Sequence, residues 1–213
     1  MSTPVNCPLC HHPRCELFHQ DNVRDYWQCL HCELVFVPTT QHVSRETEQA
    51  IYDLHQNTLD DPGYHRFLSR LAQPLLAILP PQAQGLDYGC GPAPLLARIL
   101  REAGYELKLF DPIYVNQTAV LTQVYDFITC TEVAEHFRNP DAEFARLFGL
   151  LKPNGTLAIM TKRVIDRQAF SRWHYKNDPT HISFYNEHCL HWLASHYQRQ
   201  LSLPAADVAF FYS

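Results

Sequence analysis

Two pairs of cysteines near the N-terminus have the spacing of metal ligands. Cys7-Pro-Leu-Cys10 and Cys29-Leu-His-Cys32 are C-x-x-C pairs separated by 18 residues, a pattern typical of a four-thiolate zinc ribbon. Each pair can grip an ion from a tight turn while the residues between them form a hairpin. The ion would stabilise a segment too short to bury much core. We therefore predict a structural Zn²⁺ held by Cys7, Cys10, Cys29 and Cys32.

Other donors lie close to these pairs in the sequence. Cys15, His11, His12 and His31 could substitute as ligands, but four thiolates already complete a tetrahedral site. A redox role for either pair is the weaker alternative, because neither pair follows a strand in a βαβ unit.

A second group of residues has the composition of a nucleotide-binding turn. Residues 86–94 read Leu-Asp-Tyr-Gly-Cys-Gly-Pro-Ala-Pro. Gly89 and Gly91 would let a ligand touch the backbone, and free N–H groups at the start of the following helix would face it. Asp111, 20 residues after Gly91, is placed to bind ribose hydroxyls. The pattern predicts an adenosine cofactor, but Pro94 at the sixth position of G-x-G-x-x-G/A does not favour a dinucleotide.

Two histidines follow predicted strands and could take up a proton. His136 stands in Glu132-Val-Ala-Glu135-His136, and His181 ends Asp178-Pro-Thr-His181. We expect both to lie beyond the carboxyl ends of strands, where open α/β sheets bind ligands. The alternative is that Glu135 and His136 orient a loop and that His181 only bonds backbone.

Alternating strands and helices must position these residues. Residues 1–40 contain paired cysteines and short aromatic strands, and residues 41–81 show helical spacing of leucines, with a break predicted at Pro74. From residue 82 to residue 213 strands alternate with helices, which predicts βαβ units and a parallel sheet. The predicted strands are 85–89, 105–110, 125–129, 156–161 and 208–212, and the predicted helices begin at Pro94, Asn139 and Asn186.

The glycine block resembles motif I of class I S-adenosylmethionine-dependent methyltransferases, usually D-x-G-C-G-x-G, and here D-Y-G-C-G-P-A-P. The resemblance continues in order through residues 109–112, 125–140, 150–161 and 173–185. It is strongest to methyltransferases with an N-terminal zinc ribbon. It implies an α/β fold with a Rossmann-like methyltransferase sheet (residues 82–213), a helical lid or connector (41–81) and a small zinc ribbon (1–40).

The resemblance also assigns the cofactor site. It implies that the methionine end is held by Asp87 and by the turn Tyr88, Gly89, Cys90 and Gly91, and the ribose by Asp111 next to Pro112. Cys130, Thr131 and Glu132 would border cofactor and substrate. Tyr64 would cover the methionine carboxylate, with plain helix packing as its alternative.

Two departures from the family pattern affect the expected fold. Ala93 stands where a third glycine is usual, and only residues 112–123 separate two predicted strands. A shortened or missing third strand is therefore expected, and no adenine-binding carboxylate is assigned.

Composition narrows the class of acceptor. The chain has 213 residues and a net charge of −5, and residues 1–40 carry Arg14 and Arg24 against four acidic residues. A nucleic-acid partner is not expected from such a balance.

No apolar run approaches the 18 residues of a membrane span, and no signal peptide is evident, so we expect a cytoplasmic location. Residues 162–176 mix five basic residues with aromatics, which favours either an anionic or aromatic acceptor or a solvated loop.

We therefore expect an enzyme, an S-adenosylmethionine-dependent methyltransferase that acts on a small molecule. His181 and His136 are its expected catalytic residues. The zinc ribbon could contact a protein partner. The alternatives are an RNA methyltransferase with a zinc-binding N-terminal segment and a non-catalytic zinc-ribbon scaffold.

Overall fold

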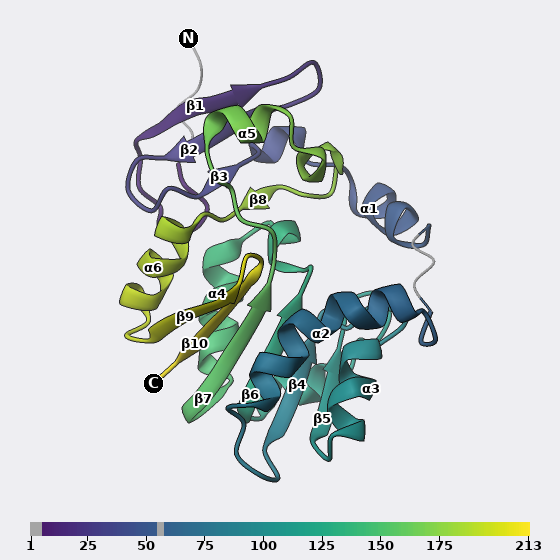
Figure 1. Cartoon of the computed structure of the whole chain (residues 1–213). Helices are drawn as coiled ribbons and strands as arrows, with labels where there is room; N and C mark the ends of the chain where they lie inside the picture. Colours follow the sequence, from purple (N-terminus) through teal and green to yellow (C-terminus); the bar gives the residue numbers. More distant parts are fainter. Residues whose placement is uncertain (1–5, 55–57) are drawn as a thin grey trace.

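Six strands form the sheet on which the rest of the chain is built. In a computed structural model that describes residues 6–54 and 58–213, their order is β5-β4-β6-β7-β10-β9 (Figure 1). The strands are β4 (Gln84–Tyr88), β5 (Glu106–Phe110), β6 (Tyr125–Thr131), β7 (Leu151–Met160), β9 (Gln200–Ala205) and β10 (Val208–Tyr212). Strands β5, β4, β6 and β7 are parallel, and β10 runs antiparallel to both β7 and β9.

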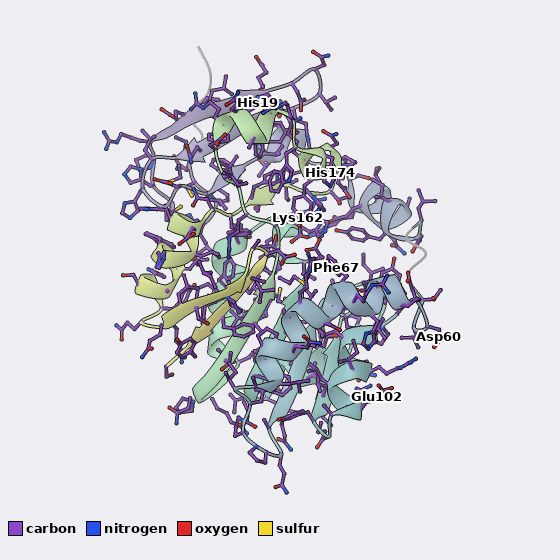
Figure 2. The ribbon with its side chains drawn as sticks, in the orientation of Figure 1. His19, Asp60, Phe67, Glu102, Lys162 and His174 are labelled. Carbon is purple, nitrogen blue, oxygen red and sulfur yellow. The ribbon has the colours of Figure 1, made fainter. Side chains whose placement is uncertain are left out.

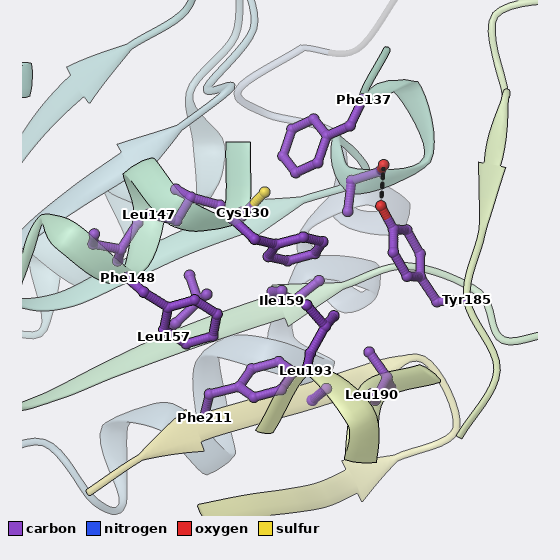
Figure 3. Packing of buried hydrophobic residues seen from close by; sticks show 14 of the residues in the cluster. Cys130, Phe137, Leu147, Phe148, Leu157, Ile159, Tyr185, Leu190, Leu193 and Phe211 are labelled. Atoms are coloured by element: carbon purple, nitrogen blue, oxygen red, sulfur yellow. Dashed lines mark hydrogen bonds between the residues drawn. The ribbon is translucent and has the colours of Figure 1, made fainter. Parts of the chain in front are cut away.

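Helices cover both faces of this sheet because its buried side chains alternate between them. Phe127 and Phe210 point toward α2 (Pro62–Leu76) and α3 (Leu95–Glu102), whereas Ile128 and Phe211 point toward α4 (Pro140–Gly149) and α6 (Glu187–His196). Figure 3 shows the second face, where Tyr185 also donates a 3.0 Å hydrogen bond to the carbonyl of Ala134. Nearly continuous burial along β7 and β10 is expected for a sheet covered on both faces.

Side-chain caps fix where the helices begin. Asp61, Asn139 and Asn186 each accept a hydrogen bond from the backbone at the start of α2, α4 and α6. Helix α2 continues through Pro74 and ends at Leu76, so a break at Pro74 does not occur. A proline in the last turn removes one backbone donor without interrupting the earlier turns.

The expected loss of the third strand is confirmed. Described residues 112–123 hold only an isolated bridge between Asp111 and Val115 and the short 3₁₀ helix η2 (Thr118–Thr122). The predicted α/β class with a Rossmann-like parallel sheet is confirmed as well, because β4 lies between β5 and β6.

A second, smaller sheet contains the cysteine pairs. Its order is β1-β2-β3-β8, from β1 (Cys15–Gln20), β2 (Asp25–Cys29), β3 (Val35–Phe36) and β8 (Ser183–Phe184). Val35 pairs with Phe184, so a strand from the far end of the sequence completes this sheet. The predicted division at residues 40 and 81 stays a prediction, to which this shared sheet adds a structural link.

The segment after β7 packs on the small sheet. Helix α5 (Arg167–Ser171) places Phe170 edge-on against Phe18 and Tyr26, and the 3₁₀ helix η4 (His174–Asn177) buries Lys176. Lys162 and His174 lie 3.3 Å apart, nitrogen to nitrogen, between the two sheets (Figure 2). Arg163 donates hydrogen bonds to the carbonyls of Ala205 and Val208 in the six-stranded sheet, so this segment contacts both sheets.

The segment before the six-stranded sheet contributes η1 (Thr39–Gln41) and α1 (Arg45–Tyr52). Figure 1 shows α1 beyond the carboxyl ends of the parallel strands, and Tyr52 of α1 contacts His136 of the short helix η3 (Ala134–His136) edge-on. Within the described residues no helix is both long enough and apolar enough to cross a membrane.

Candidate active site

A cavity of about 1070 Å³ opens at the carboxyl ends of β4, β5 and β6. Its walls come from α1, the start of α2, the glycine turn after β4, the end of β5, the segment after β6, and the loop before β8. This edge of a parallel sheet is where ligands bind in open α/β folds. Of the sequence-predicted residues, the lining includes Tyr64, Tyr88, Gly89, Cys90, Gly91, Asp111, Pro112, Thr131, Glu132, His136 and His181.

The glycine turn is held in a conformation that suits glycine. Gly89 and Gly91 have φ of +77° and +64°. The N–H groups of Gly89 and Cys90 both donate to the carbonyl of Phe110, at 2.7 and 3.1 Å. A Cβ on Gly89 would overlap Val133, whereas a Cβ on Gly91 would meet no atom within 4 Å. Gly91 thus presents bare backbone to the open cavity.

Asp111 ties this turn to the end of β5. Its carboxylate accepts hydrogen bonds from the N–H groups of Gly91, Ile113 and Tyr114 at 3.0, 2.9 and 3.0 Å. A carboxylate offers about four lone-pair sites, so one remains for a hydroxyl group in the cavity. The predicted spacing of 20 residues therefore brings Gly91 and Asp111 into direct contact.

Two residues that the sequence predicted to contact the cofactor, Asp87 and Cys130, lie behind the cavity wall. Asp87 is buried, and its Oδ1 accepts a 2.7 Å hydrogen bond from the hydroxyl of Thr129. Burial raises the pKa of the Asp87 carboxyl to about 6. Cys130 is fully buried in the core cluster on the α4 side of the sheet. Neither residue lines the cavity, so their predicted cofactor contacts stay predictions.

Unpartnered polar atoms mark the end of β6. Thr131 Oγ1, Glu132 Oε1 and Arg138 Nε are buried without a hydrogen-bond partner, and all three residues line the cavity. Burial, followed by the charge of Glu135, raises the pKa of Glu132 to about 8. Buried polar groups are normally hydrogen-bonded, so this edge fits a ligand with several donors and acceptors. S-adenosylmethionine carries such groups at its methionine and ribose ends.

Aromatic side chains form the opposite wall. Tyr64 stacks on Phe67 with ring centroids 6.3 Å apart, and burial raises the pKa of Tyr64 to about 12. Tyr88 donates its hydroxyl to Glu143 and accepts a 3.0 Å hydrogen bond from Arg146. Tyr64 thus packs on its own helix and faces the cavity, so both interpretations from the sequence fit its position.

The two predicted histidines meet at one end of the cavity. The ring centroids of His136 and His181 are 4.7 Å apart. His136 Nδ1 lies 3.1 Å from the carbonyl of Thr180, and His181 Nδ1 lies 2.7 Å from the carbonyl of Tyr175. Burial lowers the pKa of His181, which favours its neutral form.

Sequence reasoning assigned no direct role in the site to two further residues of this end, Glu135 and Glu48. Glu135 is fully buried beside the histidines and accepts hydrogen bonds from Tyr175 and Thr161. Glu48 of α1 accepts a 2.9 Å bond from Arg138. The E-x-x-E-H run could have indicated Glu135, whereas Glu48 belongs to an ordinary polar helix turn that carries no motif.

The four predicted metal-ligating cysteines converge in the small sheet. One Sγ atom from each of Cys7, Cys10, Cys29 and Cys32 lies within 4.8 Å of the others. The closest pairs are Cys7–Cys32 at 3.5 Å and Cys10–Cys29 at 3.4 Å. Tetrahedral Zn²⁺ with bonds of about 2.3 Å needs sulfur atoms roughly 3.8 Å apart, so the geometry fits.

The alternative histidine donors are engaged elsewhere. His11 Nε2 lies 2.9 Å from a carboxylate oxygen of Asp141, and His31 Nε2 accepts a 3.2 Å bond from the indole of Trp192. His12 Nδ1 accepts a hydrogen bond from the backbone N–H of Arg14. Four thiols without histidine remain the ligand set favoured by the structure.

Comparison with known proteins gives a family match over most of the chain. Residues 62–201 match a family model described as a methyltransferase domain. No curated protein matches the sequence significantly. The matched residues contain the glycine turn, Asp111, Glu135 and both histidines.

Solved structures share the fold at low identity. An O-methyltransferase family protein from Burkholderia thailandensis is 13% identical, with a TM-score of 0.51 over 77% of this chain and 61% of its own. A protein from Pyrococcus horikoshii OT3 is 14% identical, with a TM-score of 0.50 over 76% of this chain and 96% of its own. The calicheamicin-biosynthesis methyltransferase CalO1 is 13% identical, with a TM-score of 0.49 over 67% of this chain and 51% of its own. This chain thus spans about half to three fifths of the CalO1 and B. thailandensis proteins.

Proposed function

We propose, from the chain's membership of the methyltransferase domain family, that it is an S-adenosylmethionine-dependent enzyme and that it methylates a small molecule bound in the cavity. The observation that carries the proposal is the sharing of one cavity by the glycine turn and the histidine pair. Cofactor and acceptor would then meet inside one cavity, which aligns them.

We propose that the cofactor lies along the glycine turn and the end of β6. Bound S-adenosylmethionine supplies a methyl group on a sulfonium sulfur. The open space at Gly91, the remaining lone pair of Asp111 and the unpartnered Thr131 Oγ1 and Glu132 Oε1 support this placement. Asp87 would act by fixing the strand end through Thr129 and not by direct contact.

The acceptor is proposed to be small and aromatic. Tyr52, Tyr64 and Phe67 give the cavity flat apolar surfaces. Six carboxylates line it (Glu48, Asp111, Glu132, Glu135, Glu143 and Asp178) against three arginines (Arg45, Arg138 and Arg146). Each arginine is already paired with Glu48 or Glu143. This charge balance argues against a polyanionic acceptor such as RNA, and none of the basic residues of 162–176 lines the cavity.

We assign activation of the acceptor to His136 and His181. Each has Nδ1 on a backbone carbonyl, so the lone pair of each neutral ring is on Nε2. Such a lone pair can take up a proton or bind a cation that polarises the acceptor.

We propose that the four thiols hold a structural Zn²⁺. The ion would fix the small sheet, and through it the loop that carries His181. A contact with a separate protein partner would use the remaining exposed face of the ribbon.

Two measurements test the proposed function. Calorimetry of the purified chain with S-adenosylhomocysteine should show one binding event. With tritiated S-adenosylmethionine, label should move into a protein-free metabolite extract and not into total RNA. Label in RNA would favour the RNA methyltransferase alternative, and absence of S-adenosylhomocysteine binding would favour the scaffold.

A further inference from the structure

Three potential metal ligands converge at the histidine end of the cavity. One ligand atom from each of Glu135, His136 and His181 lies within 4.8 Å of the other two. We infer that these residues bind a divalent cation such as Mn²⁺ or Fe²⁺, which in turn binds an oxygen atom of the acceptor. Two imidazoles and one carboxylate are a ligand set that leaves positions open on such ions. The inference rests on the proposed function, since cation and acceptor share its cavity.

In both histidines Nε2 is the nitrogen left for coordination, and in His181 it lies 3.7 Å from Oδ2 of Asp178. A carbonyl oxygen only accepts hydrogen bonds, so Nδ1 of His136 must donate to Thr180 and Nδ1 of His181 must donate to Tyr175. In metal sites, the ligating imidazole characteristically donates its other nitrogen to a carbonyl or carboxylate in this way. The rings are also held by packing, because Tyr52 contacts His136 edge-on and Tyr175 lies 4.2 Å from His181, centroid to centroid.

Glu135 is oriented as a ligand would be. Its Oε1 accepts a 2.5 Å hydrogen bond from Tyr175, and its Oε2 accepts a 2.9 Å bond from Thr161. Each oxygen keeps a further lone pair after these bonds. Fixed donors on a carboxylate set its direction and keep it available to an ion.

Glu132 and Glu135 have no cationic side chain in direct contact among the described residues. Tyr175 lies between Glu135 and Glu132, whose Oε2 is 3.4 Å from the phenol oxygen. Among the described residues, no arginine or lysine forms an ion pair with either glutamate. Lys162, the basic residue that acts on Glu132, lies over the Tyr175 ring at 5.0 Å. Buried carboxylates are normally paired or bound to a metal, and a divalent ion would supply the missing charge.

The three ligands lie where a bound ion could contact the acceptor during methyl transfer. All three line the cavity that also contains Gly91 and Asp111. An acceptor hydroxyl bound to the ion would lose its proton to water more readily, because the ion stabilises the resulting oxygen anion. That oxygen then takes the methyl carbon, and the sulfonium sulfur keeps the electron pair of the broken carbon–sulfur bond. The inference therefore points to acceptors with an ionisable hydroxyl, such as phenols.

Titration of the 213-residue chain with Mn²⁺ tests this site. Binding is detected as the loss of the free-ion signal in electron paramagnetic resonance. We expect one bound equivalent in the wild type, and binding at least tenfold weaker in Glu135→Gln, His136→Asn and His181→Asn. His191→Asn is the matched control, because His191 is exposed on α6, and it should bind as the wild type does. Mn²⁺ prefers oxygen and nitrogen ligands, so it will not report on the four thiols.

Two further readouts separate the possible failures. Electron spin echo modulation of the wild type with Mn²⁺ should show two directly bound imidazole nitrogens, a result that needs no variant to fold. Equal Mn²⁺ binding by wild type and Glu135→Gln, or an absence of imidazole coupling, would overturn the cation site. S-adenosylhomocysteine calorimetry is run on the same samples. If it still shows binding when Mn²⁺ does not bind, the methyltransferase function stands without the ion.

Discussion

Arg24 Nη1 donates a 2.9 Å hydrogen bond to the backbone carbonyl of His181, which joins the small sheet to the histidine end of the cavity. The same guanidinium also donates to the carbonyls of Lys176, Asp178 and Pro179. Arg24 is only 5% exposed. One buried side chain of the cysteine-containing segment thus fixes the backbone of a loop that lines the active site.

Arg24→Met should destabilise the protein. The substitution keeps the apolar stem but leaves the carbonyls of Pro179 and His181 without a donor, whereas those of Lys176 and Asp178 keep one each. Unsatisfied buried groups cost about 1–3 kcal/mol each before relaxation. We expect the free energy of unfolding in urea to fall by about 3 kcal/mol or more. Arg14→Met, at an exposed position of the same segment, is the control and should change it by less than about 0.5 kcal/mol. Similar stabilities for the two variants would contradict the role of Arg24.

Gly91→Ala should weaken binding of S-adenosylhomocysteine by at least tenfold. A Cβ at Gly91 would enter the open cavity where the ligand is proposed to contact backbone. Gly104→Ala is the matched control, because Gly104 also has positive φ and open space around its Cβ but does not line the cavity. Calorimetry should show near-normal binding for Gly104→Ala. Equal losses in both variants would mean that backbone strain, and not obstruction of the cavity, weakens binding.

Cys29→Ser should abolish stoichiometric zinc. One of four thiolates would be lost, and the closed tetrahedral site depends on all of them. Cys15→Ser is the control, since Cys15 lies next to this region but outside the group of four. Atomic absorption should find one zinc ion per chain in the wild type and in Cys15→Ser. Retention of a full equivalent by Cys29→Ser would exclude the four-thiolate site.

Asp87→Asn should change the dependence of stability on pH. Burial raises the pKa of Asp87 from 3.8 to about 6 in the folded chain. Below pH 3.8 the carboxyl is neutral in both states and carries no penalty. Between pH 3.8 and 6 the carboxyl ionises in the unfolded chain but stays neutral in the folded chain, so the free energy of unfolding falls as the pH rises. Above pH 6 this loss is complete and amounts to about 3 kcal/mol.

The asparagine variant lacks this loss and can still accept the hydrogen bond of Thr129. Its stability relative to the wild type should therefore rise between pH 4 and pH 7, as measured by urea unfolding at each pH. A difference that does not vary with pH would show that Asp87 titrates normally in the folded chain.

Local patterns predicted the elements that bear the glycine turn. The strand before it, the capped helices and the missing third strand follow from glycine positions, Asn–Pro or Asn caps and the short 112–123 interval. The spacing between Gly91 and Asp111 placed both residues at one edge of the sheet, because a parallel βαβ unit brings consecutive strand ends together, and the structure adds a hydrogen bond between them.

Local sequence patterns could not predict the contacts between segments that lie far apart in the chain. The two residues of β8 are too short to show a period, so their pairing with β3 has no sequence signature. The basic residues of 162–176 favoured either an acceptor pocket or a solvated loop, yet Lys176 contacts Asp21 of the N-terminal segment at 2.8 Å and Arg167 contacts Glu16 at 2.9 Å. Charge alone did not distinguish a ligand from an opposite charge elsewhere in the same chain.

The pairing of Val35 with Phe184 has a consequence for protein synthesis. At about 5–20 residues per second, the nascent chain exposes the edge of β3 on the order of ten seconds before β8 leaves the ribosome. During that interval an unpaired strand edge is open to other chains. Early capture of an ion by the four thiols would hold the N-terminal segment together through this period, so the availability of metal during translation should govern how much of the protein reaches its folded form.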